Sequence, residues 1–344
     1  FELLPFRDPD IDNWMLGAET DPPLTRAVVD WLDRYDGEQP FFLAVSYHNP
    51  HDICFYPRKN GWVTPGDSTL EIRYYGFEYQ LPSVIGTHPS QFPNLPTLPE
   101  NHPVNPGEPE FVSDKRRYHD EYGVETKLAY QEFGEQEWRG YLHAYYRLTE
   151  LVDAEVGRVL DALEANGLAG NTIVVFTSDH GDGAAAHQWS AKLSLYEESA
   201  MVPMIISFPG VIPDNRIDSL HLVSQIDIVP TLCDYAGIEA TADFSGRSWR
   251  PIIEDPRAPW RDYLVVELAD FKPDKERKGR MLRTDRFKYN VYSSGARNEQ
   301  LFDLDADPGE RRNLAFDPEY REVVDQHRAY LNAWMERTGD EVEW

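Results

Sequence analysis

The sequence predicts an α/β protein with a mostly parallel central sheet flanked by helices, followed by a smaller C-terminal antiparallel sheet plus a helix. The first observation behind this prediction is that helix-like and strand-like segments alternate up to about residue 260. The second is a change of pattern from Arg280 onward, where apolar and polar residues alternate in short runs joined by polar turns. We therefore expect two domains, residues 1–260 and 261–344.

The first half of the chain supplies helices and strands in turn. Pro22 to Tyr35 has apolar residues at helical spacing, and the nearly unbroken apolar run from Pro40 to Ser46 is typical of a central parallel strand. The helical pattern is strongest from Trp138 to Ala165 and stops at Asn166-Gly167, a common helix end. A strand-like run from Thr172 to Thr177 follows after a short turn, as in an α/β unit.

The second half continues this pattern and then departs from it. Val202 to Phe208 and Tyr263 to Glu267 have the composition of strands, and Asp227 to Tyr235 has that of a helix. Beyond the predicted antiparallel meander, apolar residues return to helical spacing from Tyr320 to Trp334. Residues 53–131 are rich in proline, tyrosine and asparagine, which predicts long binding loops where substrate selectivity would be determined.

Composition excludes several classes of function. The 344 residues include 60 acidic against 33 basic side chains, a formal net charge of −27, and no basic stripe that would attract a nucleic acid. No apolar run approaches the ~20 residues that span a bilayer, so we expect no membrane span. Two cysteines, Cys54 and Cys233, cannot form a disulfide framework.

One stretch concentrates groups suited to binding a cation and an anion. The segment SDHGDG, residues 178–183, directly follows a predicted strand, and ligands of open α/β sheets collect where strands end. Lys192 lies nine residues after this segment. Carboxylates, an imidazole and an ammonium group this close together indicate a binding site, in which Asp179 and His180 would receive a metal ion or an anionic substrate.

The same stretch resembles the second signature region of the sulfatase family, within the alkaline-phosphatase superfamily. The resemblance extends over most of the chain and implies the fold of that family and the hydrolysis of sulfate esters. The segments that carry it are PFFLAVSYHNPH (40–51), TSDHGD (177–182) with the following HQW, Lys192, LYEES and VPMIISFPG, SQIDIVPTLCDYAGI (224–238), RMLRTDRFKYNVY (280–292) and LFDLDADPGERRNLA (301–315).

The resemblance also implies roles for individual residues. Asp179 and His180 would be half of the metal site, and Lys192 would reach the sulfate. His51 would contact the sulfate and protonate the leaving oxygen, which suits an imidazole because its pKa lies near the operating pH. The residues expected to contact the substrate are His48, Arg58, His187 and Trp189.

One part of the family pattern is missing from these 344 residues. Sulfatases carry two adjacent metal-binding aspartates and a Cys/Ser-x-Pro-x-Arg motif, whose first residue becomes the formylglycine nucleophile. Cys54-Phe-Tyr-Pro-Arg58 comes closest, but its proline stands one position too late. We therefore expect the nucleophile in a missing N-terminal segment and no activity from this chain alone. The family also predicts a periplasmic or secreted enzyme.

The metal and the reaction each have alternatives. The family implies Ca²⁺, which suits carboxylate oxygens, whereas an imidazole ligand suits Mn²⁺ or Zn²⁺ better. The expected substrate is a sulfated small molecule or glycan. A phosphonate or phosphodiester hydrolase of the same superfamily is one alternative, and a non-catalytic relative that binds sulfated glycans is another.

Overall fold

The computed structural model describes residues 17–55, 71–74, 77–80, 90, 92–117, 133–190, 192–239, 243–272 and 275–344. The chain divides into two compact units. One comprises Phe1–Pro99 with Tyr122–Thr172, and the other comprises Glu100–Glu121 with Ile173–Trp344. The boundary that the sequence predicts at residue 260 lies inside the second unit, and a division at that residue stays a prediction.

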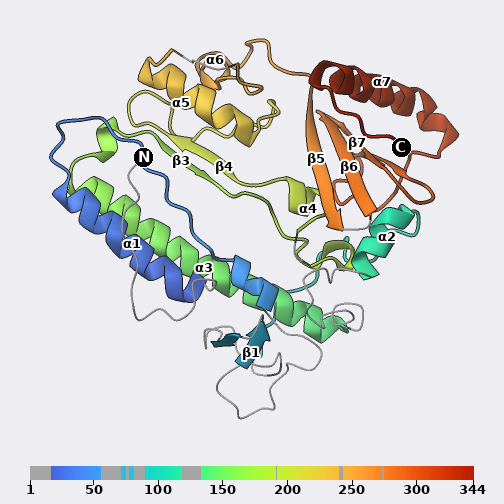
Figure 1. The fold of residues 1–344 in the computed structure, drawn as a ribbon, viewed down its shortest axis with the longest axis horizontal. Coiled ribbons are helices and arrows are strands. Elements are labelled where there is room, and N and C mark those ends of the chain that lie inside the picture. The colour runs from blue at the N-terminus through green and yellow to red at the C-terminus, as the bar shows by residue number, and fades with distance from the viewer. Residues whose placement is uncertain are drawn as a thin grey trace. The chain divides into compact units, whose positions relative to one another are not determined.

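The first unit is built on two helices that lie side by side (Figure 1). α1 (Gly17–Arg34) buries Val28 and Leu32. α3 (Glu135–Ala165) buries Trp138 and Leu148. Both predicted helices are confirmed, although α1 begins five residues earlier than its apolar spacing indicates. A short hairpin of β1 (Glu71–Tyr74) and β2 (Phe77–Gln80) and the single turns η1 (His51–Phe55) and η5 (Ala169–Asn171) complete the described elements of this unit.

The predicted parallel strand at residues 40–46 is not observed. The segment forms no ladder with any described residue, and Phe42 within it is 64% exposed. A strand requires a neighbour that accepts its backbone hydrogen bonds, and an apolar run does not supply that neighbour. Within the described residues, the segment is therefore a connection from α1 to the residues around His51.

In the second unit the two strands on either side of the SDHGDG segment pair with each other, but in antiparallel fashion. β3 (Val174–Thr177) and β4 (Met204–Ser207) align with Val174 opposite Ser207. The prediction of a mostly parallel sheet is therefore wrong for this pair. Among the described residues between the strands, regular structure is limited to η6 (Ala186–Gln188) and the one-turn helix α4 (Glu197–Ala200), and neither is the crossover helix that usually joins parallel strands.

The predicted helix after β4 is confirmed as α5 (Ile228–Ala236), which begins after the short turn η7 (Gln225–Asp227). Ser224 and Asp227 form a capping box at the start of η7, which satisfies backbone N–H groups that have no partner within the turn. The Asp227 carboxylate is fully buried and pairs with Arg261 through two hydrogen bonds. α6 (Arg250–Glu254) follows, and α2 (Glu110–Arg117) also belongs to this unit.

The C-terminal region is the predicted antiparallel meander with a helix. β5 (Tyr263–Lys272), β6 (Lys275–Thr284), β7 (Phe287–Tyr292) and β8 (Glu299–Asp303) pair in sequence order. After the turn η8 (Pro318–Tyr320), α7 (Arg321–Thr338) lies along this sheet (Figure 1). The core between helix and sheet is formed by buried side chains from both, among them Leu282, Tyr289, Leu301, Val324 and Leu331.

These elements confirm a mixed α/β architecture that ends in an antiparallel sheet and a helix. Neither Cys54 nor Cys233 forms a disulfide within the described residues. No helix in the described part of the chain is both long enough and apolar enough to cross a membrane.

Candidate active site

The predicted cation-binding pair lies on the loop that leaves β3, as expected. Backbone contacts hold this loop in place: the Gly181 N–H donates to Ser199 O at 3.0 Å, and Gln225 Nε2 donates to Ser178 O. A Cβ at position 181 would collide with the carbonyl oxygen of Glu198, so only glycine allows this approach. The SDHGDG segment is therefore fixed directly against α4.

The geometry of Asp179 and His180 suits two ligands of one metal ion. His180 Nδ1 lies 2.8 Å from Gly181 O and must carry a proton, because a carbonyl oxygen can only accept. In the neutral ring the lone pair is then on Nε2, which lies 3.3 Å from Asp179 Oδ2. Two ligand atoms about 2.3 Å from an ion and at right angles are about 3.3 Å apart. Fixing a histidine ligand through its other nitrogen is common at metal sites.

This pair is open to solvent and incomplete by itself. The Asp179 side chain is 82% exposed and that of His180 is 37% exposed, so further ligands or a substrate oxygen have access. Asp179 Oδ1 accepts the His180 N–H at 2.9 Å, which keeps the carboxylate beside the ring. Two protein ligands are fewer than a structural metal site requires. The pair therefore fits the half site that the family resemblance implies.

The side chain of Trp189 forms a hydrogen bond with the main chain of Lys192. Trp189 Nε1 donates to the carbonyl oxygen of Lys192 at 3.2 Å, and the indole is only 2% exposed. The Arg116 guanidinium lies 5.4 Å from the centre of the indole ring. Lys192 is half-buried and lies outside any helix. The buried indole thus positions the main chain at Lys192, and the role of Trp189 as a substrate contact stays a prediction.

His187, the other predicted substrate contact on this loop, is fully buried. Its ring stacks on Tyr196 with the ring centres 3.9 Å apart. Burial lowers the pKa of His187 to about 4, and the positive charges of Arg116 and Lys288 contribute. The imidazole is therefore neutral at pH 7, and its contact with substrate also stays a prediction.

His48 and His51 belong to the first unit, where the start of α1 holds their loop. Asp21 accepts the backbone N–H groups of His48 and Asn49 at 2.8 and 3.0 Å, and Thr20 Oγ1 lies 2.9 Å from His48 Nδ1. The N–H of His51 donates to His48 O at 2.8 Å. Burial raises the pKa of Asp21, against the effect of its backbone donors. The side chains of α1 thereby determine the conformation of the loop that leads to His51.

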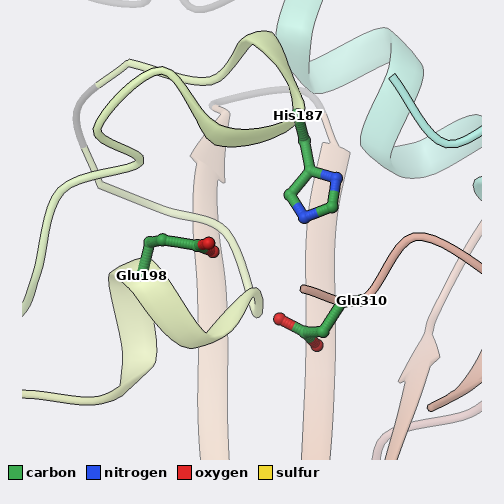
Figure 2. Close-up of side chains that lie close together, drawn as sticks. All are labelled: His187, Glu198 and Glu310. Atoms are coloured by element: carbon green, nitrogen blue, oxygen red, sulfur yellow. The ribbon is translucent and has the colours of Figure 1, made fainter. Parts of the chain in front are cut away.

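The structure reveals residues that the sequence reasoning missed. Asp52, next to His51, is fully buried and accepts N–H groups of Gly17 and Ala18. Glu198 and Glu310 meet His187 in a cluster of potential metal ligands (Figure 2). Of these residues, only Asp52 could have been noticed in the sequence, through its position next to His51. The residues that each of the three contacts are distant in sequence. Arg58 lies outside the described residues.

Comparison with known proteins identifies two matching family models. The model described as "Sulfatase" matches residues 6–238. The model described as "N-sulphoglucosamine sulphohydrolase, C-terminal" matches residues 185–337. Together they include the SDHGDG loop, the residues around His51 and the C-terminal sheet.

Individual proteins agree with these models. A Delta 4,5-hexuronate-2-O-sulfatase of Bacteroides thetaiotaomicron is 32% identical, over 88% of this chain and 58% of the relative. Arylsulfatase K of Rattus norvegicus is 32% identical, over 90% of this chain and 52% of the relative. The chain thus spans little more than half the length of these relatives. A solved structure described as a 2-O GAG sulfatase superimposes with a TM-score of 0.77 at 30% identity, covering 98% of this chain and 67% of the other.

Proposed function

The chain belongs to the sulfatase family, and we propose that the protein hydrolyses sulfate esters of carbohydrates at a metal-assisted site that includes Asp179 and His180. The observation that carries this proposal is the 3.3 Å separation of His180 Nε2 and Asp179 Oδ2 on an exposed loop. A curated relative is named for the 2-O-sulfate of a hexuronate, and a similar solved structure is described as a 2-O GAG sulfatase. The narrowest substrate class we propose is therefore a 2-O-sulfated hexuronate glycan.

The metal proposed for the site is Ca²⁺, with Mn²⁺ or Zn²⁺ as alternatives. Sulfatases in general use a divalent metal and a formylglycine. Asp179 would supply a carboxylate oxygen, which suits Ca²⁺. His180 would supply an imidazole nitrogen, which suits Mn²⁺ or Zn²⁺ better. When bound, such an ion supplies positive charge to the non-bridging sulfate oxygens. The nucleophile is assigned to no residue of this chain.

Two further residues have proposed roles in the reaction. The Lys192 ammonium group would attract the sulfate, a necessary role in a chain with a net charge of −27. A ring nitrogen of His51 would give a proton to the leaving oxygen, so that an alcohol rather than an alkoxide departs. The periplasmic or secreted location also stays a prediction.

The first test compares Asp179→Ala with Asp214→Ala, an exposed aspartate of the same unit. Both substitutions are made in the product of the complete gene, and its metal content and its turnover of 2-O-sulfated unsaturated disaccharides are measured. We expect Asp179→Ala to lose nearly all activity and the site's metal, because a ligand of the charge-stabilising ion is removed. Asp214→Ala should keep the metal content and the turnover of the unchanged enzyme. Full activity with normal metal content in Asp179→Ala would remove this loop from the catalytic site.

The same assay separates the alternative functions. Faster turnover of phosphonate monoesters or phosphodiesters than of any sulfate ester would identify the phosphonate and phosphodiester class instead. Binding of sulfated glycans without turnover by the product of the complete gene would identify a non-catalytic relative. Parallel assays of residues 1–344 alone test the prediction that this chain is inactive by itself, and robust turnover would mean that it contains a nucleophile.

A further inference from the structure

We propose that His187, Glu198 and Glu310 form a second, buried divalent-metal site, separate from the Asp179–His180 pair. Figure 2 shows the three side chains converging from different segments of the second unit. They come from η6, from α4 and from the turn that follows β8. One potential ligand atom of each residue lies within 4.8 Å of the other two.

The imidazole of His187 lacks the hydrogen bonds that a buried polar ring normally makes. The ring is fully buried, and Nδ1 has no hydrogen-bond partner among the described residues. Nε2 lies 3.4 Å from Asn101 Nδ2. That amide makes shorter contacts to Glu198 Oε1 at 2.7 Å and to Gly309 O at 3.1 Å, which use both of its hydrogens. A neutral imidazole without a good hydrogen bond is a suitable metal ligand.

Both carboxylates have capacity left for a metal ion. Glu198 Oε2 is inaccessible to solvent and has no hydrogen-bond partner within the described part of the chain. Glu310 is 1% exposed, with Oε2 accepting the Glu197 N–H at 2.6 Å and Oε1 lying 2.8 Å from Lys288 Nζ. A carboxylate oxygen can accept two interactions, so these contacts leave lone pairs on Glu310.

The charges around the cluster also favour a cation. Among the described residues that contact one another here, three carry carboxylates, Glu197, Glu198 and Glu310, and two are cations, Lys288 and Arg283. Arg116, whose charge also acts on His187, is paired with Glu108. Lys288 Nζ lies 3.0 Å from Glu197 Oε1, and Arg283 Nε lies 3.9 Å from Glu197 Oε2. One negative charge is left without compensation in a buried region, where an unpaired charge is costly. A divalent ion would neutralise it, and a shared proton is the competing explanation.

The donor set indicates the class of metal. One imidazole nitrogen with two carboxylate oxygens suits Zn²⁺, Mn²⁺ or Fe²⁺ better than Mg²⁺ or Ca²⁺. Ligand atoms around a tetrahedral zinc are about 3.3 Å apart, so the two glutamates would close toward the ring by small side-chain rotations. The ion would join three distant segments of the chain. Its role would be structural: holding the loop that carries Asp179 and Lys192 against the C-terminal sheet.

The test uses the full chain with the first site removed by Asp179→Ala and His180→Ala. We expect this protein to bind one equivalent of Zn²⁺ or Mn²⁺ and its melting temperature to rise with metal concentration, as ligand linkage requires. Adding Glu198→Gln, which keeps an acceptor for Asn101, should weaken binding at least tenfold. Glu322→Gln, an exposed glutamate of α7, is the matched control and should change nothing. No binding by the folded double variant, or equal affinity after Glu198→Gln, would overturn the proposal in favour of a shared proton.

Coordination by His187 is measured without replacing it, because a substitution at a fully buried position risks unfolding the chain. Co²⁺ is added to the variant that lacks Asp179 and His180, and the proton NMR spectrum is recorded. A single strongly shifted imidazole N–H resonance is expected, from the ring nitrogen that does not bind the metal. A folded, Co²⁺-loaded protein without that resonance would exclude His187 as a ligand. Neither measurement depends on sulfatase activity, so failure of the proposed function would leave this test intact.

Discussion

Replacing Asp52 with asparagine should remove one source of pH dependence from the stability of the first unit. The Asp52 carboxylate is fully buried beside His51. Its two oxygens accept the N–H groups of Gly17 and Ala18 at 2.8 and 3.0 Å, at the start of α1. Burial raises the pKa of Asp52 from 3.8 to about 6, with the negative charge of Asp21 contributing, although the two N–H donors oppose the shift.

The sign and size of the effect follow from linkage. Because the pKa is higher in the folded chain, the folded chain holds this proton more tightly than the unfolded chain, and ionising Asp52 reduces stability as the pH rises. A shift of about two units corresponds to about 3 kcal/mol. The free energy of unfolding of the wild type, relative to Asp52→Asn, should therefore fall by about 3 kcal/mol on going above pH 6, mostly between about pH 4 and 6.

Urea unfolding of both proteins, followed by tryptophan fluorescence from pH 4 to 8, measures this difference. Titrating groups that do not interact with Asp52 cancel because they are present in both chains. Asp30→Asn is the matched control, since Asp30 is an exposed aspartate on the same helix. The reasoning would be refuted if the free energy of unfolding of the wild type, minus that of Asp52→Asn, stayed constant or rose with pH. It would mean that the helix N–H groups stabilise the carboxylate more than burial destabilises it.

Three substitutions test other parts of the structure, and the two that concern activity are made in the product of the complete gene. Lys192→Ala should lower kcat about 10²–10³-fold, because one positive charge near the developing negative charge is lost, and unchanged kinetics would place Lys192 away from the sulfate. His51→Ala should slow esters with poor leaving groups by about 10²–10⁴-fold but spare activated aryl sulfates. An equal loss on both would indicate sulfate binding instead of proton transfer. Arg261→Ala should lower the free energy of unfolding by about 3–5 kcal/mol, since it leaves the fully buried carboxylate of Asp227 without its ion pair. If urea unfolding showed a loss below about 1 kcal/mol, the backbone N–H donors alone would be sufficient to stabilise the buried Asp227 carboxylate.

Features that depend on neighbouring residues could be predicted from the sequence. The helix over residues 138–165 was expected from its apolar spacing and is observed as α3 over Glu135–Ala165. The meander after Arg280 was expected from its alternation and is observed as paired strands. The Asp179–His180 pair was expected after a strand and lies there. Periodicity and turn residues act over a few positions, and so one segment contains all the information they require.

Features that depend on a distant partner appeared only in the tertiary structure. The first described N–H groups of α1, those of Gly17 and Ala18, donate to Asp52, which lies far along the chain. The apolar run at residues 40–46 meets no described strand, and β3 pairs with β4 in the direction that the sequence did not predict. His187 meets Glu310 through the path of the chain, not through spacing. By itself the sequence determined the local elements, the family resemblance and the Asp-His pair. Tertiary structure decided strand pairing, helix capping and the buried cluster, because burial and hydrogen bonding join groups without regard to their separation in sequence.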